Sequence, residues 1–260
     1  VFLNGGFPAR QLRCLDLHSG AIHWTRELPQ LSYASPAVTD SLVVLGANDG
    51  AYRGFSRETG DLVWTYATYG DVLLCAACVT DSGWAYAVPG GDDFRLHGWQ
   101  VADPQQVDGS WTLTLADPDA PTDYILGKQL AGAAPTLSGD AVACLVRFQY
   151  NYWRNGSYAY VLHERLFLVD PATQQVRWSV QLGTLETTNL HEVPALGHCP
   201  GPITISDGSR SYLVVSTSLQ AELRFLDVQA GTQLASFLKV GAQWGAAASP
   251  AVANGLCFAN

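Results

Sequence analysis

The segment CLDLHSGAIHW, residues 14–24, decides the fold, because its pattern returns four more times along the chain. Three of the later copies also have eleven residues and end in Trp: GFSRETGDLVW at 54–64, VADPQQVDGSW at 101–111 and LVDPATQQVRW at 168–178. The fifth copy, FLDVQAGTQLA at 225–235, keeps the Asp and the Gly and ends in Ala. A pattern that recurs in this way predicts a fold built from repeated units.

A second pattern alternates with the first and consists of two apolar segments joined by a short polar turn. Its copies begin at Ser35, Ala77, Ala134, Gly201 and Ser249. Together the two patterns predict four short strands per unit, and no segment has a convincing helical period of 3.6 residues. The recurring Trp is large enough to fill the space between neighbouring small sheets. The predicted fold is therefore an all-β propeller with four-stranded antiparallel blades.

The turn that precedes each Trp is expected to shape the unit. Asp stands eight residues before the Trp, except in the second copy, where Ser56 takes its place. Gly20, Gly60 and Gly231 lie where the turn needs a positive φ. We expect each Trp to be buried between sheets and each Asp to lie at a turn. The predicted structural positions are Asp16, Trp24, Trp64, Asp103, Trp111, Asp170, Trp178 and Asp227.

The arrangement of a small residue, Asp, Ser/Thr-Gly and Trp resembles the tryptophan-docking repeat of the pyrroloquinoline quinone (PQQ) propeller family. The resemblance is clearest at residues 14–24 and covers nearly the whole chain, with departures at Val107, Gln174 and Ala235. That family includes eight-bladed quinoprotein alcohol and glucose dehydrogenases. It also includes non-enzymatic relatives such as the outer-membrane protein assembly lipoprotein. The resemblance therefore implies a PQQ-like propeller and leaves the activity open.

The repeats divide the chain into a single propeller domain, 1–260, with incomplete units at both ends. We expect a partial blade at 1–29, blades at 30–72, 73–115, 130–183 and 200–240, and a partial blade at 246–260. This division predicts a fragment of a larger propeller, for which eight blades are one option. The chain has no Met and opens at Val1, which favours a mature or excised segment without its signal sequence.

Composition narrows the classes of partner. The 260 residues include 48% hydrophobic and 14% charged residues, which excludes a disordered chain. The longest apolar run, residues 72–79, is far shorter than the roughly 18 residues of a membrane-spanning helix, so no transmembrane segment is expected. The net charge of -9 opposes binding to a phosphate backbone, so nucleic acid is not an expected partner.

Insertions between the repeats fall on one predicted face. They lie in connections between blades, at 116–129 and 183–200, and between second and third strands, at 89–95 and 148–160. In an up-and-down blade these two kinds of connection emerge on the same side. Loops of variable length on a rigid scaffold often carry binding sites.

The segment 148–160 stands out because six of its thirteen residues are aromatic, against 11% of the chain. Its Asn155-Gly156 pair predicts a hairpin that projects beyond its blade. The rings could pack on each other and on the loop 116–129, or they could form a recognition surface for protein or sugar. The candidate binding residues are Tyr150, Tyr152, Trp153, Tyr158 and Tyr160.

Three clusters suggest site chemistry, and each has a simpler interpretation. Cys75 and Cys78 form a CxxC pair, but it leads into a predicted strand and lacks a following His, which favours a strand-entry pair or a disulfide. His191, His198 and Cys199 are weak metal-ligand candidates in one long loop. The acidic residues of 117–123 lack the Gly and Glu of a calcium loop, so a solvated acidic loop is expected.

The sequence favours a non-catalytic module over an enzyme. A quinoprotein dehydrogenase would imply bound PQQ, a calcium ion, a catalytic Asp and, in many members, adjacent cysteines. No two cysteines are adjacent, and no position here matches the catalytic Asp or the calcium ligands. We therefore expect a binding or scaffold propeller without a cofactor, periplasmic or extracellular, that recognises a protein or a glycan. Part of a PQQ- and calcium-dependent dehydrogenase is the alternative.

Overall fold

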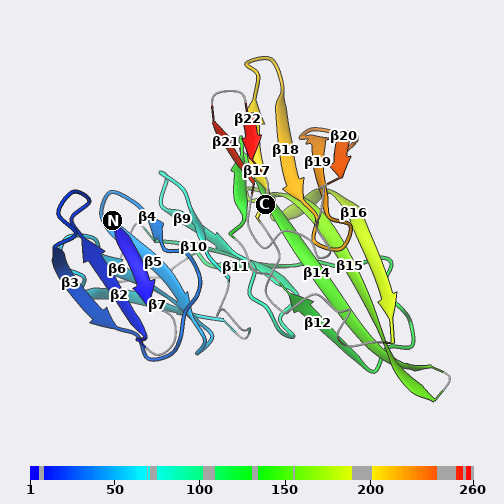
Figure 1. Cartoon of the computed structure of the whole chain (residues 1–260), viewed down its shortest axis with the longest axis horizontal. Coiled ribbons are helices and arrows are strands. Elements are labelled where there is room, and N and C mark those ends of the chain that lie inside the picture. The colour runs from blue at the N-terminus through cyan, green and yellow to red at the C-terminus, as the bar shows by residue number, and fades with distance from the viewer. Residues whose placement is uncertain are drawn as a thin grey trace.

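The computed structural model shows a chain of β-sheets arranged one after another (Figure 1). It describes residues 1–5, 9–68, 70, 75–101, 109–130, 134–154, 156–188, 201–238, 250–253 and 256–258. Within these ranges every regular element is a strand, which confirms the all-β fold class. None of the described residues forms a helix long and apolar enough to cross a membrane.

Three sheets have four strands each, and in each of them every strand pairs antiparallel with the next one along the chain. The first comprises β4 (Ala37–Val38), β5 (Leu42–Ala47), β6 (Ala51–Ser56) and β7 (Leu62–Ala67). The second comprises β8 (Cys78–Val79), β9 (Trp84–Ala87), β10 (Arg95–Gln100) and β11 (Trp111–Thr114). The third comprises β17 (Ile203–Ser206), β18 (Ser211–Ser216), β19 (Glu222–Asp227) and β20 (Gln233–Leu238).

The remaining sheets depart from this plan. A three-stranded sheet contains β1 (Phe2–Gly5), β2 (Gln11–Leu15) and β3 (Ile22–Glu27). A five-stranded sheet contains β12 (Leu126–Leu130), β13 (Thr136–Ser138), β14 (Ala141–Arg154), β15 (Ser157–Asp170) and β16 (Gln175–Thr187). The last two strands, β21 (Ala251–Ala253) and β22 (Leu256–Phe258), pair with each other.

Consecutive sheets meet through their first strands, which are short. Strand β4 contacts β8. The thiol of Cys78 in β8 interacts with the backbone of Leu137 in β13. Thr204 of β17 donates a hydrogen bond of 2.8 Å from Oγ1 to the carbonyl oxygen of Leu137. First strands that meet while the sheets fan outward are the arrangement of propeller blades.

The recurring turn has the same geometry in four of the units. A register shift, or β-bulge, follows Cys14, Gly54, Leu168 and Phe225, the residues aligned at the start of each copy. Asp16, Asp170 and Asp227 each accept two backbone N–H groups of the following turn through Oδ1. Short polar side chains at this position therefore satisfy turn amides that no strand partner reaches.

The third unit departs from the expected alignment. Trp111 pairs with Gly98 across the ladder, just as Trp64 pairs with Gly54. Thirteen positions separate Gly98 from Trp111, whereas ten separate Gly54 from Trp64. The turn of this unit is therefore longer than that of the second unit, and the expected alignment of residues 101–111 with the other copies is wrong. Asp103 lies outside the described residues, and the register places Gln100 where Asp16 stands in the first unit.

The tryptophans lie where neighbouring sheets face each other. Trp24, Trp64 and Trp111 are buried, and Trp178 is half-buried. The indole Nε1 of Trp24 donates to the carbonyl oxygen of Arg57 in the next sheet at 3.1 Å, and a Cβ at Gly60 would lie 2.7 Å from its ring. Gly60 has φ +77°, so glycine at this turn provides both the backbone conformation and the space.

The fourth and fifth units repeat this contact. Trp178 donates from Nε1 to the carbonyl oxygen of Val228 at 2.8 Å and packs on Gly231.

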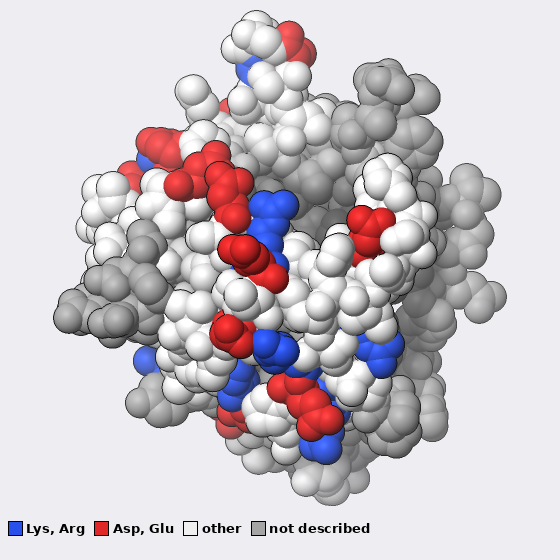
Figure 2. Space-filling view, turned by 90° about the vertical axis from the view of Figure 1, so that its left-hand side faces the viewer, with Lys and Arg blue, Asp and Glu red and all other residues white. Residues whose placement is uncertain are grey.

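The side of the molecule near β1 to β7 is mostly uncharged, with acidic and basic groups beside one another (Figure 2). Arg26 and Asp61, 2.8 Å apart, form one such pair between two sheets.

Candidate binding surface

The hairpin of β14 and β15 projects away from the other sheets (Figure 1). Each of its strands has 14 residues, against six in β5 and in β6. The ladder continues without a shift from Val142 opposite Val169 to Arg154 opposite Ser157. Gly156 at the turn has φ +77°. The predicted projecting hairpin is confirmed, although Asn155 itself lies outside the described residues.

Two other strands support the extension. Strand β13 pairs with the first residues of β14, and β12 pairs with its later residues, from Arg147 to Asn151. On the other side, β16 continues to Thr187, opposite Tyr160. The sheet therefore starts before and ends after the expected blade of 130–183. Part of the insertion 116–129 is strand β12, because its backbone completes the edge of the longer hairpin.

One face of the hairpin is buried under the preceding loop. Phe148, Tyr150 and Tyr152 alternate along β14 and are all buried. Tyr150 donates from its hydroxyl to Asp117 at 2.9 Å, and Tyr152 donates to Glu186 at 2.5 Å. Tyr150 also packs against Tyr124, with ring centroids 5.1 Å apart. The packing alternative therefore holds for Tyr150 and Tyr152, and neither belongs to an exposed binding face.

Contacts of Asp117 hold this loop against the hairpin. Its Oδ2 lies 2.7 Å from Nδ1 of His163, its Oδ1 lies 3.4 Å from Nε of Arg165, and its side chain is buried. Arg165 also pairs with Asp119. Burial raises the pKa of Asp117, but hydrogen bonds from His163 and Tyr150 and the charge of His163 outweigh it and hold the pKa below its usual value. The prediction of a solvated acidic loop is therefore wrong for Asp117, whose side chain is buried.

A buried ion pair fixes the opposite face of the hairpin to the next sheet. Arg147 and Glu164, both fully buried, face each other across the ladder, with Nη2 and Oε1 3.1 Å apart. Glu164 also accepts the backbone N–H groups of Ser218 and Leu219 at 3.0 and 3.1 Å. Sequence reasoning missed this contact. Its only signal is a pair of charges inside long apolar strands.

The tip of the hairpin exposes two aromatic rings on the face that carries Arg147 and Glu164. Trp153 and Tyr158 lie opposite each other in the ladder, and their ring centroids are 4.8 Å apart with an interplanar angle of 85°. They are 56% and 52% exposed, whereas Tyr160 is half-buried. Ile125, whose N–H donates to the carbonyl oxygen of Asn151, is also exposed. Trp153 and Tyr158 form the hairpin tip surface.

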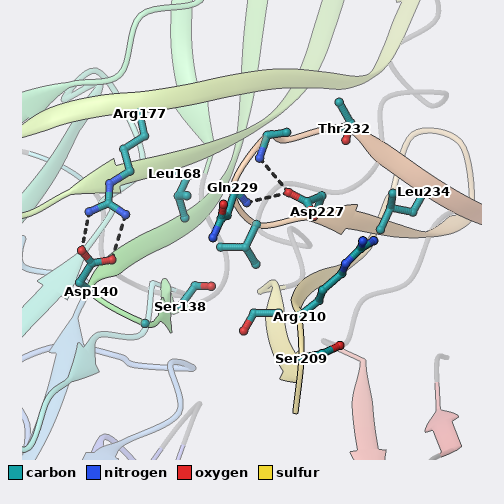
Figure 3. Close-up of a pocket in the computed structure, with 14 residues that line it drawn as sticks. Ser138, Asp140, Leu168, Arg177, Ser209, Arg210, Asp227, Gln229, Thr232 and Leu234 are labelled. Atoms are coloured by element: carbon teal, nitrogen blue, oxygen red, sulfur yellow. Dashed lines mark hydrogen bonds and ion pairs between the residues drawn. The ribbon is translucent and has the colours of Figure 1, made fainter. Parts of the chain in front are cut away.

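A polar groove lies at the other end of the sheets (Figure 3). Its volume is about 900 Å³, and its walls are the β13–β14, β17–β18 and β19–β20 turns with parts of β15, β16 and β20. Arg177 pairs with Asp140 at 2.7 Å and with Asp170 at 2.9 Å on its rim. Sequence reasoning missed this groove, because its walls come from two units.

The other predicted chemical sites have no support in the described residues. His191, His198 and Cys199 lie outside them, and inside them no three His, Cys, Asp or Glu side chains form a group that could hold a metal ion. Cys75 and Cys78 form no disulfide in the described part of the chain. Burial raises the pKa of Cys78 to about 11, so its thiol is a poor nucleophile at neutral pH.

Comparison with known proteins places this architecture in a family. The sequence profile described as "Outer membrane protein assembly factor BamB" matches residues 7–151, more than half of the 260 residues. The chain belongs to this BamB family. No curated protein sequence matches the chain.

Solved structures share the fold of this BamB family member. The crystal structure of BamB from Moraxella catarrhalis is 18% identical, with a TM-score of 0.51 over 98% of this chain and 74% of that one. Quinohemoprotein alcohol dehydrogenase from Comamonas testosteroni is 12% identical, with a TM-score of 0.57 over 92% of this chain and 41% of that one. The predicted PQQ-like propeller is confirmed, and at these identities the structural likeness concerns the fold alone.

The dehydrogenase relative raises the question of PQQ and calcium. A calcium site needs six to eight oxygen ligands, several of them carboxylates. In the described ranges the carboxylates of Asp93, Asp117 and Glu164 are buried, but each is bound by Arg or His. In this BamB family member, these donor sets fit ion pairs and do not fit a calcium site.

Proposed function

We propose that this chain is a non-catalytic propeller that binds a protein partner through the hairpin tip surface. The observation that carries the proposal is the exposed Trp153–Tyr158 pair at the end of a supported hairpin. Aromatic anchors of this kind often dominate the energy of protein interfaces. The buried rings below them and the Arg147–Glu164 pair hold the strands in place, so little conformational entropy is lost on binding.

The family description supports the class of partner. Because the matching profile is named for an outer membrane protein assembly factor, we infer that the partner is a protein of outer-membrane assembly and that the chain works in the periplasm. The recurring tryptophans act in this proposal as docking residues that keep the blades rigid. A glycan could also stack on exposed rings, and the experiment below separates these two kinds of ligand.

The first experiment maps the partner by photocrosslinking in cell envelopes that contain the protein. A photoreactive aromatic residue replaces Tyr158 in one variant and Tyr33, an exposed residue on another part of the molecule, in the control. We expect a discrete protein adduct from position 158 and none from position 33. Equal adducts at both positions, or binding of envelope glycans without a protein adduct, would contradict the proposal.

The second experiment removes the anchor. The double variant Trp153→Ser/Tyr158→Ser should weaken retention of the crosslinked partner at least about 30-fold, because anchors at interfaces often contribute 2 kcal/mol or more. The melting temperature should change little, since both rings are exposed. Undiminished retention would refute the site. Reduction of a quinone-linked dye after addition of PQQ and calcium would instead support the dehydrogenase alternative.

A further inference from the structure

We propose that the polar groove of Figure 3 is a second binding site and that it takes a peptide segment with an acidic side chain. The groove lies between the sheets of β13–β16 and β17–β20. Its walls include the turns between first and second strands, which lie at the end opposite the hairpin tip (Figure 1). The proposal is therefore independent of the hairpin tip surface and of the function proposed for it.

Arg210 is the group of the groove that is available to an anion, because the other charged side chains of the lining are already bound. Asp140 is held by both terminal nitrogens of Arg177, at 2.9 and 2.7 Å, and Asp227 accepts two turn N–H groups at 2.9 Å each. The exposed Arg210 is different, because within the described residues no carboxylate pairs with its guanidinium. Arg177 thus neutralises Asp140, backbone amides hold Asp227, and the nearby Asp207 accepts the backbone N–H of Arg210 at 2.8 Å. The guanidinium of Arg210 is left available to a carboxylate.

Uncharged polar groups stand beside this cation. Ser138 is 3% exposed, and among the described residues its hydroxyl has no hydrogen-bond partner. Figure 3 shows this hydroxyl pointing away from Asp140 and into the groove. A buried hydroxyl without a partner is costly, so a ligand that bonds to it gains affinity. The side chain of Gln229 also lines the groove and adds an amide.

The shape and the apolar part of the lining favour a peptide over a small free acid. Leu234 and Val228 line the groove together with the polar groups, and the side chain of Arg210 extends toward Leu234 (Figure 3). Leu234 is 51% exposed, which leaves apolar area for a neighbouring side chain of the ligand. Ser209, Arg210 and Gln229 are exposed, so the groove opens to solvent and admits a segment of a larger protein.

Binding is tested with a blocked hexapeptide of alternating Leu and Glu, labelled with a fluorophore and titrated by anisotropy. Its matched controls are the Leu-Gln hexapeptide, which has the same shape without charge, and free glutamate. We expect saturable binding of the Leu-Glu peptide to the whole chain, and binding at least about tenfold weaker for both controls. The Leu-Gln peptide lacks the charged hydrogen bond, which is stronger than a neutral one, and free glutamate lacks the leucine side chains that contact the apolar lining.

Two variants locate the site. Arg210→Ala should weaken binding of the Leu-Glu peptide about tenfold, and Ser138→Ala, which removes only the hydroxyl, should weaken it several-fold. Arg13→Ala, at an exposed arginine of β2 outside the groove, should leave it unchanged. The proposal is overturned by absence of saturable binding, by equal binding of the Gln peptide or free glutamate, or by equal losses in the Arg210 and Arg13 variants. The Trp153→Ser/Tyr158→Ser variant should bind the peptide normally.

Discussion

The sheet of β4 to β7 and the sheet of β12 to β16 contain the same repeat but are stabilised differently. In the first, all six residues of β5 are buried, and none of them carries a charge. In the second, β14 and β15 continue past the propeller body and bury Arg147, His163, Glu164 and Arg165. Where neighbouring blades face each other, the buried contacts are mostly apolar. Where the hairpin leaves the blades, ion pairs and hydrogen bonds to loops replace that packing.

The largest expected effect concerns the body of the propeller. Trp64 of β7 is buried, packs over Gly54 and lies edge-on to Trp99. Trp64→Ala should lower the free energy of unfolding by about 3–5 kcal/mol, because it leaves a large cavity between sheets. Urea unfolding measures this, with Trp153→Ala at the exposed tip as the control, expected to cost less than about 0.5 kcal/mol. Similar losses for both variants would contradict the comparison.

The next effect concerns the buried Arg147–Glu164 ion pair of the β14–β15 hairpin. Arg147→Met leaves Glu164 buried without its charged partner and should cost about 3 kcal/mol. Arg177→Met breaks the pairs of the partly exposed Arg177 with Asp140 and Asp170, and it should cost clearly less than Arg147→Met because solvent screens these charges. Chemical unfolding of the two variants side by side checks the difference. A cost for Arg147→Met no greater than for Arg177→Met would show that burial of charge does not stabilise the hairpin.

A smaller effect concerns the loop that Asp117 holds against the hairpin. A carboxyl whose pKa is lowered by folding stabilises the fold above its unfolded pKa of about 4, and this contribution disappears as the pH falls through the folded pKa. Asp117→Asn should therefore cost about 1–2 kcal/mol at pH 7, and the gap to the unmodified protein should close with acidification below pH 4.

The control for this prediction is Asp123→Asn, at an exposed carboxyl of the same loop, which should change stability by less than about 0.5 kcal/mol at pH 7. Thermal unfolding of the three proteins at pH 7, 5 and 3 distinguishes the cases. A gap for Asp117→Asn that stays constant with pH would show that its charge does not hold the loop.

The smallest effect concerns a single backbone conformation. Gln174 has φ +56° at the turn where Gly20, Gly60 and Gly231 stand in other units. A side chain is strained in this conformation, so Gln174→Gly should stabilise the protein by about 0.5–1 kcal/mol. Gln175→Gly, at the start of β16, should be destabilising instead. A loss of stability on Gln174→Gly would refute the assignment of strain.

Local patterns were sufficient to predict the repeated turns. Asp16 and Trp24 occupy the places expected from spacing alone, because the turn that joins them is closed by contacts within a few residues. The third unit was misaligned because Val101 happens to stand ten positions before Trp111. The better signal was Gly98 in RLHGWQ, which corresponds to Gly54 in AYRGFS and lies under the indole ring in the same way.

The candidate sites were harder to predict because they depend on distant segments. Side chains alternate along a strand, so Tyr152 and Trp153 must lie on opposite faces of the hairpin. Only the loop that contains Asp117 decides which of the two faces is covered. Glu164 is satisfied by Ser218, which is 54 residues away in sequence. The groove combines Ser138 with Arg210 from a different unit. No spacing rule within one repeat connects such residues.

The uninterrupted ladder of the β14–β15 hairpin restricts how this region can change in length during evolution. Two residues added to each strand would lengthen the hairpin and leave every ring on its present face. One residue added to each strand would exchange the faces of everything beyond the insertion, exposing Tyr152 and turning Trp153 toward the loop of Asp117. Insertions and deletions tolerated in related proteins should therefore occur here in steps of two residues per strand, so that the hairpin varies in reach while its tip keeps its orientation.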